Sequence, residues 1–191
     1  PDEGREMTLM EHMVELRDRL VKAVLGLAGG TVIGFIFARR VFDIFIASAP
    51  DSVEIVALSP TDTIIQYFKV ALVLGVIVAM PVILYQVLQF VLPGLYPHER
   101  RYLYWLLPAA TIAFAAGALF SGFLVVPVSV RYLSGFMADV VSPTYQIQNY
   151  ISFITTLMFW VGVVFEMPLV IYFLAKLKII DHKKLASWRK Y

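Results

Sequence analysis

Four long apolar segments separated by short polar stretches dominate the hydrophobicity pattern of this 191-residue chain. A helix of about 20 apolar residues crosses the hydrocarbon core of a bilayer, so each segment is long enough to span a membrane. The predicted spans are 23–46, 63–92, 102–127 and 150–175. The predicted connections are loops at 47–62, 93–101 and 128–149 and a polar tail at 176–191. We therefore predict an all-α, polytopic membrane protein with a single transmembrane domain.

The first 22 residues follow a different pattern, in which apolar side chains recur every three or four positions. The recurring residues are Leu9, Met13, Leu16 and Leu20. This spacing is typical of an amphipathic helix, because it gathers the apolar side chains on one face. We expect residues 1–22 to form a separate helix that lies along the membrane interface, ahead of the first span.

The composition narrows the class of protein. Hydrophobic residues make up 60% of the chain and charged residues 16%, which excludes an ordinary soluble domain. A net charge of +2 does not indicate a nucleic-acid partner. The absence of cysteine excludes disulfides and thiol catalysis. The sequence contains no phosphate-binding glycine loop, zinc-protease motif or nucleophile elbow, so we predict neither an enzyme nor a bound cofactor.

The histidines do not indicate a metal site. His12, His98 and His182 are widely separated, and no further ligands follow them at a suitable spacing. We interpret all three as interfacial or solvated side chains.

Basic residues are distributed unequally between the two sides of the predicted spans. Twelve lysines and arginines fall on the side of the amino terminus and four on the other side. Those four are Arg39, Arg40, Lys69 and Arg131. The positive-inside rule therefore predicts a cytoplasmic amino terminus, with the loop 93–101 and the tail on the same side.

Glu166 is the acidic residue of the fourth predicted span. Ionisable groups at the centre of a membrane helix cost about 2.5 to 3.5 kcal/mol on insertion scales, and they normally face a protein partner or a wet cavity. One interpretation is therefore a functional polar group inside the membrane. The other is a hydrogen bond within the chain, to Gln86 or Gln89.

Two further acids, Glu15 and Glu99, lie at the predicted cytoplasmic surface next to apolar segments. Two carboxylates there could bind a basic ligand, and they would favour arginine over lysine because a guanidinium binds a carboxylate through two parallel hydrogen bonds. The alternative is local pairing of Glu15 with Arg19 and of Glu99 with Arg100.

Several separated motifs resemble the TatC family, the receptor subunit of the twin-arginine protein translocase. They are His12-Met13-Val14-Glu15-Leu16-Arg17-Asp18-Arg19-Leu20, Ser59-Pro60-Thr61, Pro81-Val82-Ile83-Leu84-Tyr85-Gln86, Tyr96-Pro97-His98-Glu99-Arg100-Arg101 and Phe165-Glu166-Met167-Pro168. They follow one another in the family's order over nearly the whole chain. The family has six spans, so the resemblance implies two more beyond the four present here.

The resemblance implies a receptor in the cytoplasmic (inner) membrane that binds the paired arginines of signal peptides. Glu99 would be the chief contact, with the remaining binding residues nearby: Glu15, Arg17, His12, Arg19 and Arg100. Glu166, together with Gln86, would face a groove that receives single-span TatB- and TatA-type partners. Transport would draw on the proton motive force. Association of several copies of the chain is left open.

A function of another class is also considered. In a proton-coupled secondary transporter or channel, Glu166 would be an ion relay and the proline-broken helices would line a site at the membrane midplane. Such a protein would carry an ion or small-molecule flux and would not depend on arginines in a peptide. An intramembrane enzyme is disfavoured, because no second catalytic group lies at the depth of Glu166.

Overall fold

A computed structural model of the chain describes residues 9–91, 100–136 and 144–176. Its elements, in chain order, are α1 (Leu9–Ala47), β1 (Glu54–Val56), α2 (Asp62–Val91), α3 (Arg100–Phe120), the π-helical turn η2 (Ser121–Val125), α4 (Val126–Gly135), β2 (Thr144–Gln146) and α5 (Ile147–Lys176). Within these residues, four helical segments are long and apolar enough to cross a membrane. The prediction of an all-α, polytopic membrane protein is confirmed.

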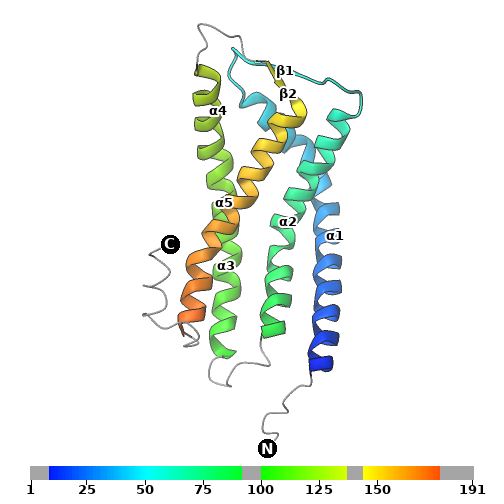
Figure 1. Cartoon of the computed structure of the whole chain (residues 1–191), viewed down its shortest axis with the longest axis vertical. Helices are drawn as coiled ribbons and strands as arrows, with labels where there is room; N and C mark the ends of the chain where they lie inside the picture. Colours follow the sequence, from blue (N-terminus) through cyan, green and yellow to red (C-terminus); the bar gives the residue numbers. More distant parts are fainter. Residues whose placement is uncertain (1–8, 92–99, 137–143, 177–191) are drawn as a thin grey trace, which may run out of the picture.

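The helices form a bundle with two distinct ends. Figure 1 shows α1 beside α2, α3 end to end with α4, and α5 running obliquely from the strands to lie against α3. We call the end that carries β1 and β2 the strand end, and the opposite end, where α1 begins, the amino-terminal end. Helices α2 and α5 finish at the amino-terminal end, and α3 begins there (Figure 1).

Helix α1 is continuous where two helices were expected. The predicted boundary between an interfacial helix at 1–22 and a span at 23–46 is absent, since one 39-residue helix runs from Leu9 through that boundary to Ala47. No proline interrupts this stretch, so nothing in the backbone ends the helix there. At 1.5 Å per residue α1 is about 58 Å long, roughly twice the hydrocarbon thickness. The amphipathic stretch is therefore an extension of the span.

The third span also extends further than predicted. Helix α4 continues to Gly135, so the first part of the predicted loop 128–149 is helical. Pro127 does not end the helix, because it follows a π-helical turn in which the Val126 N–H donates to the carbonyl of Ser121. The wider π turn accommodates a residue that lacks an N–H donor. Helices α2 and α5 begin and end within three residues of their predicted bounds.

The two strands were not predicted. β1 and β2 pair in parallel, with Ile55 opposite Tyr145. Each strand has three residues, too few for an alternating pattern to be visible in the sequence. Their pairing joins the connection before α2 to the start of α5. The Asp62 carboxylate strengthens this join, since its Oδ2 accepts a hydrogen bond from the Gln146 amide at 3.3 Å.

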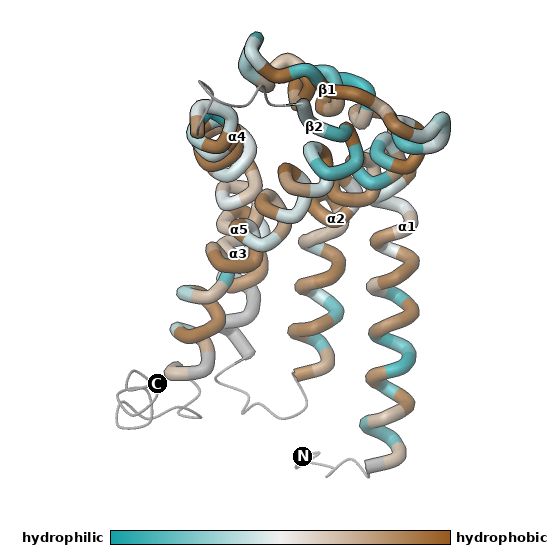
Figure 2. Tube along the Cα trace, turned by 45° about the horizontal axis from the view of Figure 1, so that its top comes forward, coloured by the Kyte–Doolittle hydropathy of each residue, from teal (hydrophilic) through white to brown (hydrophobic). Residues whose placement is uncertain are grey.

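Close packing of small residues brings α1 and α2 together. A β-carbon on Gly34 would collide with the carbonyl oxygen of Ala71, and one on Gly30 would lie 2.5 Å from the carbonyl oxygen of Gly75. Backbones approach this closely only where side chains are absent. A buried hydrophobic cluster lies toward the strand end and includes Phe45, Val126, Ile151 and Ile154. Figure 2 shows apolar residues along the middle of the helices and hydrophilic residues on the lower part of α1 and at the strand end.

Candidate functional site

Five side chains form a cluster between α1 and α2 at the amino-terminal end. Its members, which we call the acid–arginine cluster, are His12, Glu15 and Arg19 of α1 and Gln86 and Phe90 of α2. The α1 members are three and four residues apart, and the α2 members are four apart. These spacings place each set on a single helix face, so the two faces meet where the helices pack.

Arg19 connects the two helices. Its Nη2 donates to Glu15 Oε1 at 3.3 Å, and its Nη1 donates to Gln86 Oε1 at 3.5 Å. The Arg19 and Glu15 side chains are 25% and 15% exposed, so this pair is shielded from solvent far better than an ordinary surface pair. The alternative predicted for Glu15, local pairing with Arg19, is present in the structure.

The other oxygen of Glu15 lacks a hydrogen bond. Glu15 Oε2 is buried and has no hydrogen-bond partner among the described residues. The His12 Nδ1 atom lies 3.9 Å from Glu15 Oε2, which is too long for a hydrogen bond. An unsatisfied buried carboxylate oxygen is costly, and a donor supplied by a ligand would remove that cost.

An aromatic contact closes one side of the cluster. The imidazole of His12 stacks on the ring of Phe90, with ring centroids 4.3 Å apart and an interplanar angle of 18°. Phe90 lies at the last turn of α2, nine residues before Glu99 in the sequence. The stack therefore joins α1 to the last turn of α2 three residues from Glu15.

The remaining predicted peptide-binding residues are placed differently. Arg17 points away from the cluster and pairs with Asp18 at 3.1 Å, and both side chains are exposed. The structure therefore does not bring Arg17 to Glu15. Glu99 lies outside the described residues. Arg100 begins α3, but its side chain is also outside the description.

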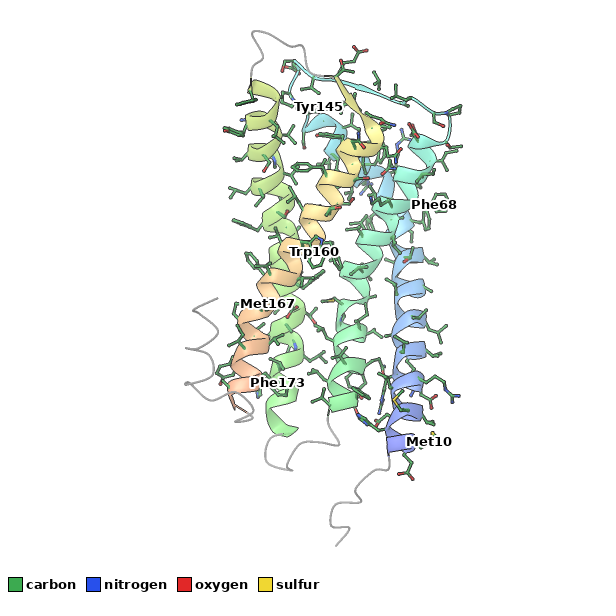
Figure 3. All side chains as sticks on the ribbon, in the orientation of Figure 1. Met10, Phe68, Tyr145, Trp160, Met167 and Phe173 are labelled. Carbon is green, nitrogen blue, oxygen red and sulfur yellow. The ribbon has the colours of Figure 1, made fainter. Side chains whose placement is uncertain are left out.

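Glu166 lies in a second location, beside a cavity at the amino-terminal half of the bundle. Its side chain is almost fully buried at 7% exposure. The cavity has a volume of about 230 Å³, and apart from Glu166 its lining is apolar: Leu84, Val87, Leu88, Val91, Leu106, Ala110, Leu169, Val170 and Phe173. In Figure 3, the neighbouring residue Met167 and the lining residue Phe173 mark this part of α5.

The structure does not bring Gln86 and Glu166 together. Gln86 accepts a hydrogen bond from Arg19, whereas Glu166 Oε1 is buried without a hydrogen-bond partner among the described residues. The internal hydrogen bond to Gln86 or Gln89, considered from the sequence, is therefore missing at this atom. Glu166 combines an apolar cavity with an acceptor that a group from outside the chain could satisfy.

A polar contact between α2 and α5 was not predicted from the sequence. We call its members, Gln66, Lys69 and Ser152, the polar seam. Lys69 Nζ donates to Ser152 Oγ at 2.9 Å, and Ser152 Oγ lies 3.5 Å from Gln66 Oε1. The sequence did contain a signal for this contact: three polar residues lie four and three positions apart on one face of an apolar helix, at Asp62, Gln66 and Lys69. The seam joins the helices near the strand end, whereas the Glu166 cavity separates them near the other end.

Among the described residues, no group of three His, Asp or Glu side chains is arranged to hold a metal ion.

Comparison with known proteins yields one family. Residues 11–191 match the model of the Sec-independent protein translocase protein (TatC). The TatC protein of Aquifex aeolicus is 40% identical over 97% of this chain and 79% of its own length. That of Carboxydothermus hydrogenoformans is 36% identical over 99% of this chain and 78% of its own. The chloroplastic protein of Pisum sativum is 31% identical over 99% of this chain and 54% of its own.

Solved structures agree with the sequence comparison. A crystal structure of the twin-arginine translocase receptor TatC in the detergent DDM superposes with a TM-score of 0.86 at 40% identity, covering 95% of this chain and 83% of that one. A second crystal structure of the receptor gives a TM-score of 0.84 at 41% identity. The chain therefore belongs to the TatC family of the Sec-independent protein translocase, a family of transport components rather than enzymes.

Proposed function

We propose that this chain is the receptor and core subunit of a twin-arginine translocase, and that its acid–arginine cluster binds the paired arginines of a signal peptide. The observation that carries the proposal is the buried, unpaired Oε2 of Glu15. A guanidinium from a peptide supplies the missing donor and adds a charge-assisted hydrogen bond. Arg19 already donates to the other oxygen, Oε1, so Oε2 is the oxygen left for a donor from the peptide.

The cluster is also suited to selecting arginine over lysine. A guanidinium is planar, so it can stack beside the His12 and Phe90 rings while donating to Glu15. An ammonium group is compact and strongly hydrated, and it gains less from this arrangement. Glu99 follows α2 by eight residues and is proposed as the second carboxylate of the site, one for each arginine of the pair.

Glu166 is proposed as a contact for single-span TatB- and TatA-type partners. A buried carboxyl with an unpaired oxygen, in a cavity otherwise lined by apolar side chains, suits a partner helix that carries one polar group in an apolar face. The partner would cover apolar surface and satisfy Glu166 at the same time. Arg17 is exposed and pairs with Asp18 rather than with Glu15, so it is proposed to contact the peptide outside the paired arginines.

The proposed setting is the cytoplasmic membrane, with the amino-terminal end of the bundle facing the cytoplasm. The basic residues support this orientation, because twelve of the sixteen lie on that side in the sequence. Both the acid–arginine cluster and the Glu166 cavity then lie toward the cytoplasmic side. No nucleotide-binding motif occurs in the sequence, which agrees with transport driven by the proton motive force.

The test is a binding measurement in nanodiscs with a signal peptide that carries Arg-Arg and the same peptide with Lys-Lys. We expect tight binding of the Arg-Arg peptide alone, and loss of that preference in Glu15→Gln and in Glu99→Ala. Asp18→Asn is the matched control, since it removes an exposed acid from the same helix. Equal binding of both peptides, or an unchanged preference in both test variants, contradicts the proposal.

A further inference from the structure

We propose that a zwitterionic glycerophospholipid with a primary ammonium group binds between α1 and α2 at the strand end, with its phosphate on Arg39 and its ammonium on Asp43. This site lies at the opposite end of the bundle from the acid–arginine cluster and is independent of the proposed receptor function. The inference rests on a cavity, an ion pair with unused donors and an apolar track that leaves the cavity.

The cavity has a volume of about 450 Å³ and all its lining residues are described: Arg39, Phe42, Asp43, Thr63, Ile64 and Tyr67. It therefore combines one cation, one anion and two hydroxyl groups, those of Thr63 and Tyr67, with aromatic and aliphatic walls. A phospholipid has complementary groups: a charged headgroup for the ion pair, glycerol oxygens for the hydroxyl groups and acyl chains for the apolar walls. Arg40, the neighbouring cation, does not line this cavity.

The ion pair uses only part of each side chain. Arg39 Nε donates to both oxygens of Asp43, at 3.3 and 3.2 Å. Both terminal nitrogens of the guanidinium are left without a partner among the described residues, and they form the fork that binds phosphate oxygens in pairs. Asp43 keeps acceptor capacity for an ammonium group, because each carboxylate oxygen accepts more than one hydrogen bond.

The arrangement of charges favours a zwitterion over an anion. A lipid with only a phosphate would place its negative charge next to Asp43, whose carboxylate lies one turn from Arg39. A headgroup that carries phosphate and ammonium matches both members of the pair. A primary ammonium also donates three hydrogen bonds, whereas a quaternary one donates none.

An apolar track leads from the cavity toward the middle of the bundle. Phe68 lies one turn from Ile64 on α2 and packs edge-on against Phe35 of α1, with ring centroids 5.0 Å apart. Figure 3 shows Phe68 projecting from the outside of the bundle. Ile64 and Phe68 are 60% and 56% exposed in the protein alone, so they offer apolar surface to an acyl chain. This continuity identifies the occupant as a lipid rather than a free headgroup.

The test is native mass spectrometry of the chain after removal of lipid in detergent, titrated separately with phosphatidylethanolamine, phosphatidylcholine and phosphatidylglycerol of the same acyl chains. We expect phosphatidylethanolamine to bind roughly tenfold more tightly than the other two, as expected for one additional charge-assisted hydrogen bond. Asp43→Asn should lower its affinity to that of phosphatidylcholine. Arg39→Gln should weaken all three lipids.

Two matched controls keep the experiment specific. Arg131→Gln removes an exposed arginine from α4, and Asp51→Asn removes an exposed acid near the same end of the bundle. Both should bind phosphatidylethanolamine as the unmodified chain does. Tightest binding of phosphatidylglycerol, equal binding of the three lipids, or equal effects of the test and control variants would overturn the proposal. Far-ultraviolet circular dichroism of each variant shows that it remains folded.

Discussion

Glu15 and Arg19, one turn apart on α1, pair through a single oxygen of the carboxylate, with Arg19 Nη2 3.3 Å from Glu15 Oε1. The second oxygen, Oε2, is buried without a hydrogen bond to any described residue. The sequence does not reveal this, because the spacing of Glu15 and Arg19 predicts only that the two side chains pair. Arg19 is itself held in place by the Gln86 side chain of α2, whose Oε1 accepts a hydrogen bond from Arg19 Nη1. The Glu15 carboxylate therefore keeps one oxygen for a donor from outside the chain.

Glu15→Gln should lower the affinity for an Arg-Arg signal peptide by roughly tenfold or more, because a hydrogen bond to a charged group is worth about 1.5 to 3 kcal/mol. Isothermal titration calorimetry on the chain in nanodiscs measures this change. Asp18→Asn should leave the affinity unchanged, since Asp18 pairs with Arg17 on the exposed side of α1. A similar loss in both variants would point to a general charge effect and would contradict a specific site at Glu15.

Gly34→Ala should destabilise the bundle, because its new methyl group would collide with the carbonyl of Ala71 and force α1 and α2 apart. Overpacking of this kind costs about 1 to 3 kcal/mol. Gly29→Ala is the matched control on the same helix, since a β-carbon at Gly29 meets no atom within 4 Å. It should leave stability unchanged or raise it by up to about 1 kcal/mol through helix propensity. Unfolding in detergent with increasing SDS separates the two; equal stability of both variants would refute the close-packing argument.

Glu166→Leu should raise the free energy of unfolding of the chain alone by about 1 to 3 kcal/mol, because it removes a buried polar group that lacks a partner. The same variant should lose site-specific crosslinks to a single-span partner. Glu166→Gln keeps hydrogen-bonding capacity and should retain part of them. Met167→Leu is the control, since Met167 is 50% exposed. Unchanged crosslinks in Glu166→Leu would remove its proposed role.

The same variants address the rival function at Glu166. Proteoliposomes containing the chain should show equal proton flux with Glu166 and with Glu166→Gln, because the proposed role of this carboxyl is contact with a partner. A proton flux that disappears with Glu166→Gln and does not depend on signal peptide would favour the proton-coupled transporter or channel.

Ser152→Ala and Lys69→Met should show a coupling energy of about 0.5 to 1.5 kcal/mol in a double-mutant cycle of unfolding, because the two side chains share a 2.9 Å hydrogen bond between α2 and α5. Thr111→Val is the control partner for Lys69→Met, since the Thr111 hydroxyl bonds within its own helix, to the carbonyl of Leu107. A coupling of zero for Lys69 and Ser152 would show that the seam does not join the helices.

Much of the architecture follows from local properties of the sequence. The apolar segments around Ala71 and Ile154 can be recognised as membrane helices from the sequence, because they are long enough to cross a bilayer and carry few charges. Glu166 and Glu15 were conspicuous for the same reason, as acids in apolar surroundings. The hydropathy pattern mispredicted two helix ends, one at residues 22 and 23 and one at Pro127, where the helices in fact continue. Helix ends depend on backbone hydrogen bonds, which hydropathy does not describe.

By itself, the sequence determined the class of protein, the number of spans present and the distribution of basic residues. It also singled out the acidic residues that lie in apolar surroundings. These properties depend only on composition and on the order of residues along the chain. Only the tertiary structure decided which groups meet. It joined Gln86 to Arg19 rather than to Glu166, turned Arg17 away, and paired Lys69 with Ser152. Such contacts depend on the rotation and close approach of helices, which in α1 and α2 is set by Gly34 lying against the backbone of Ala71.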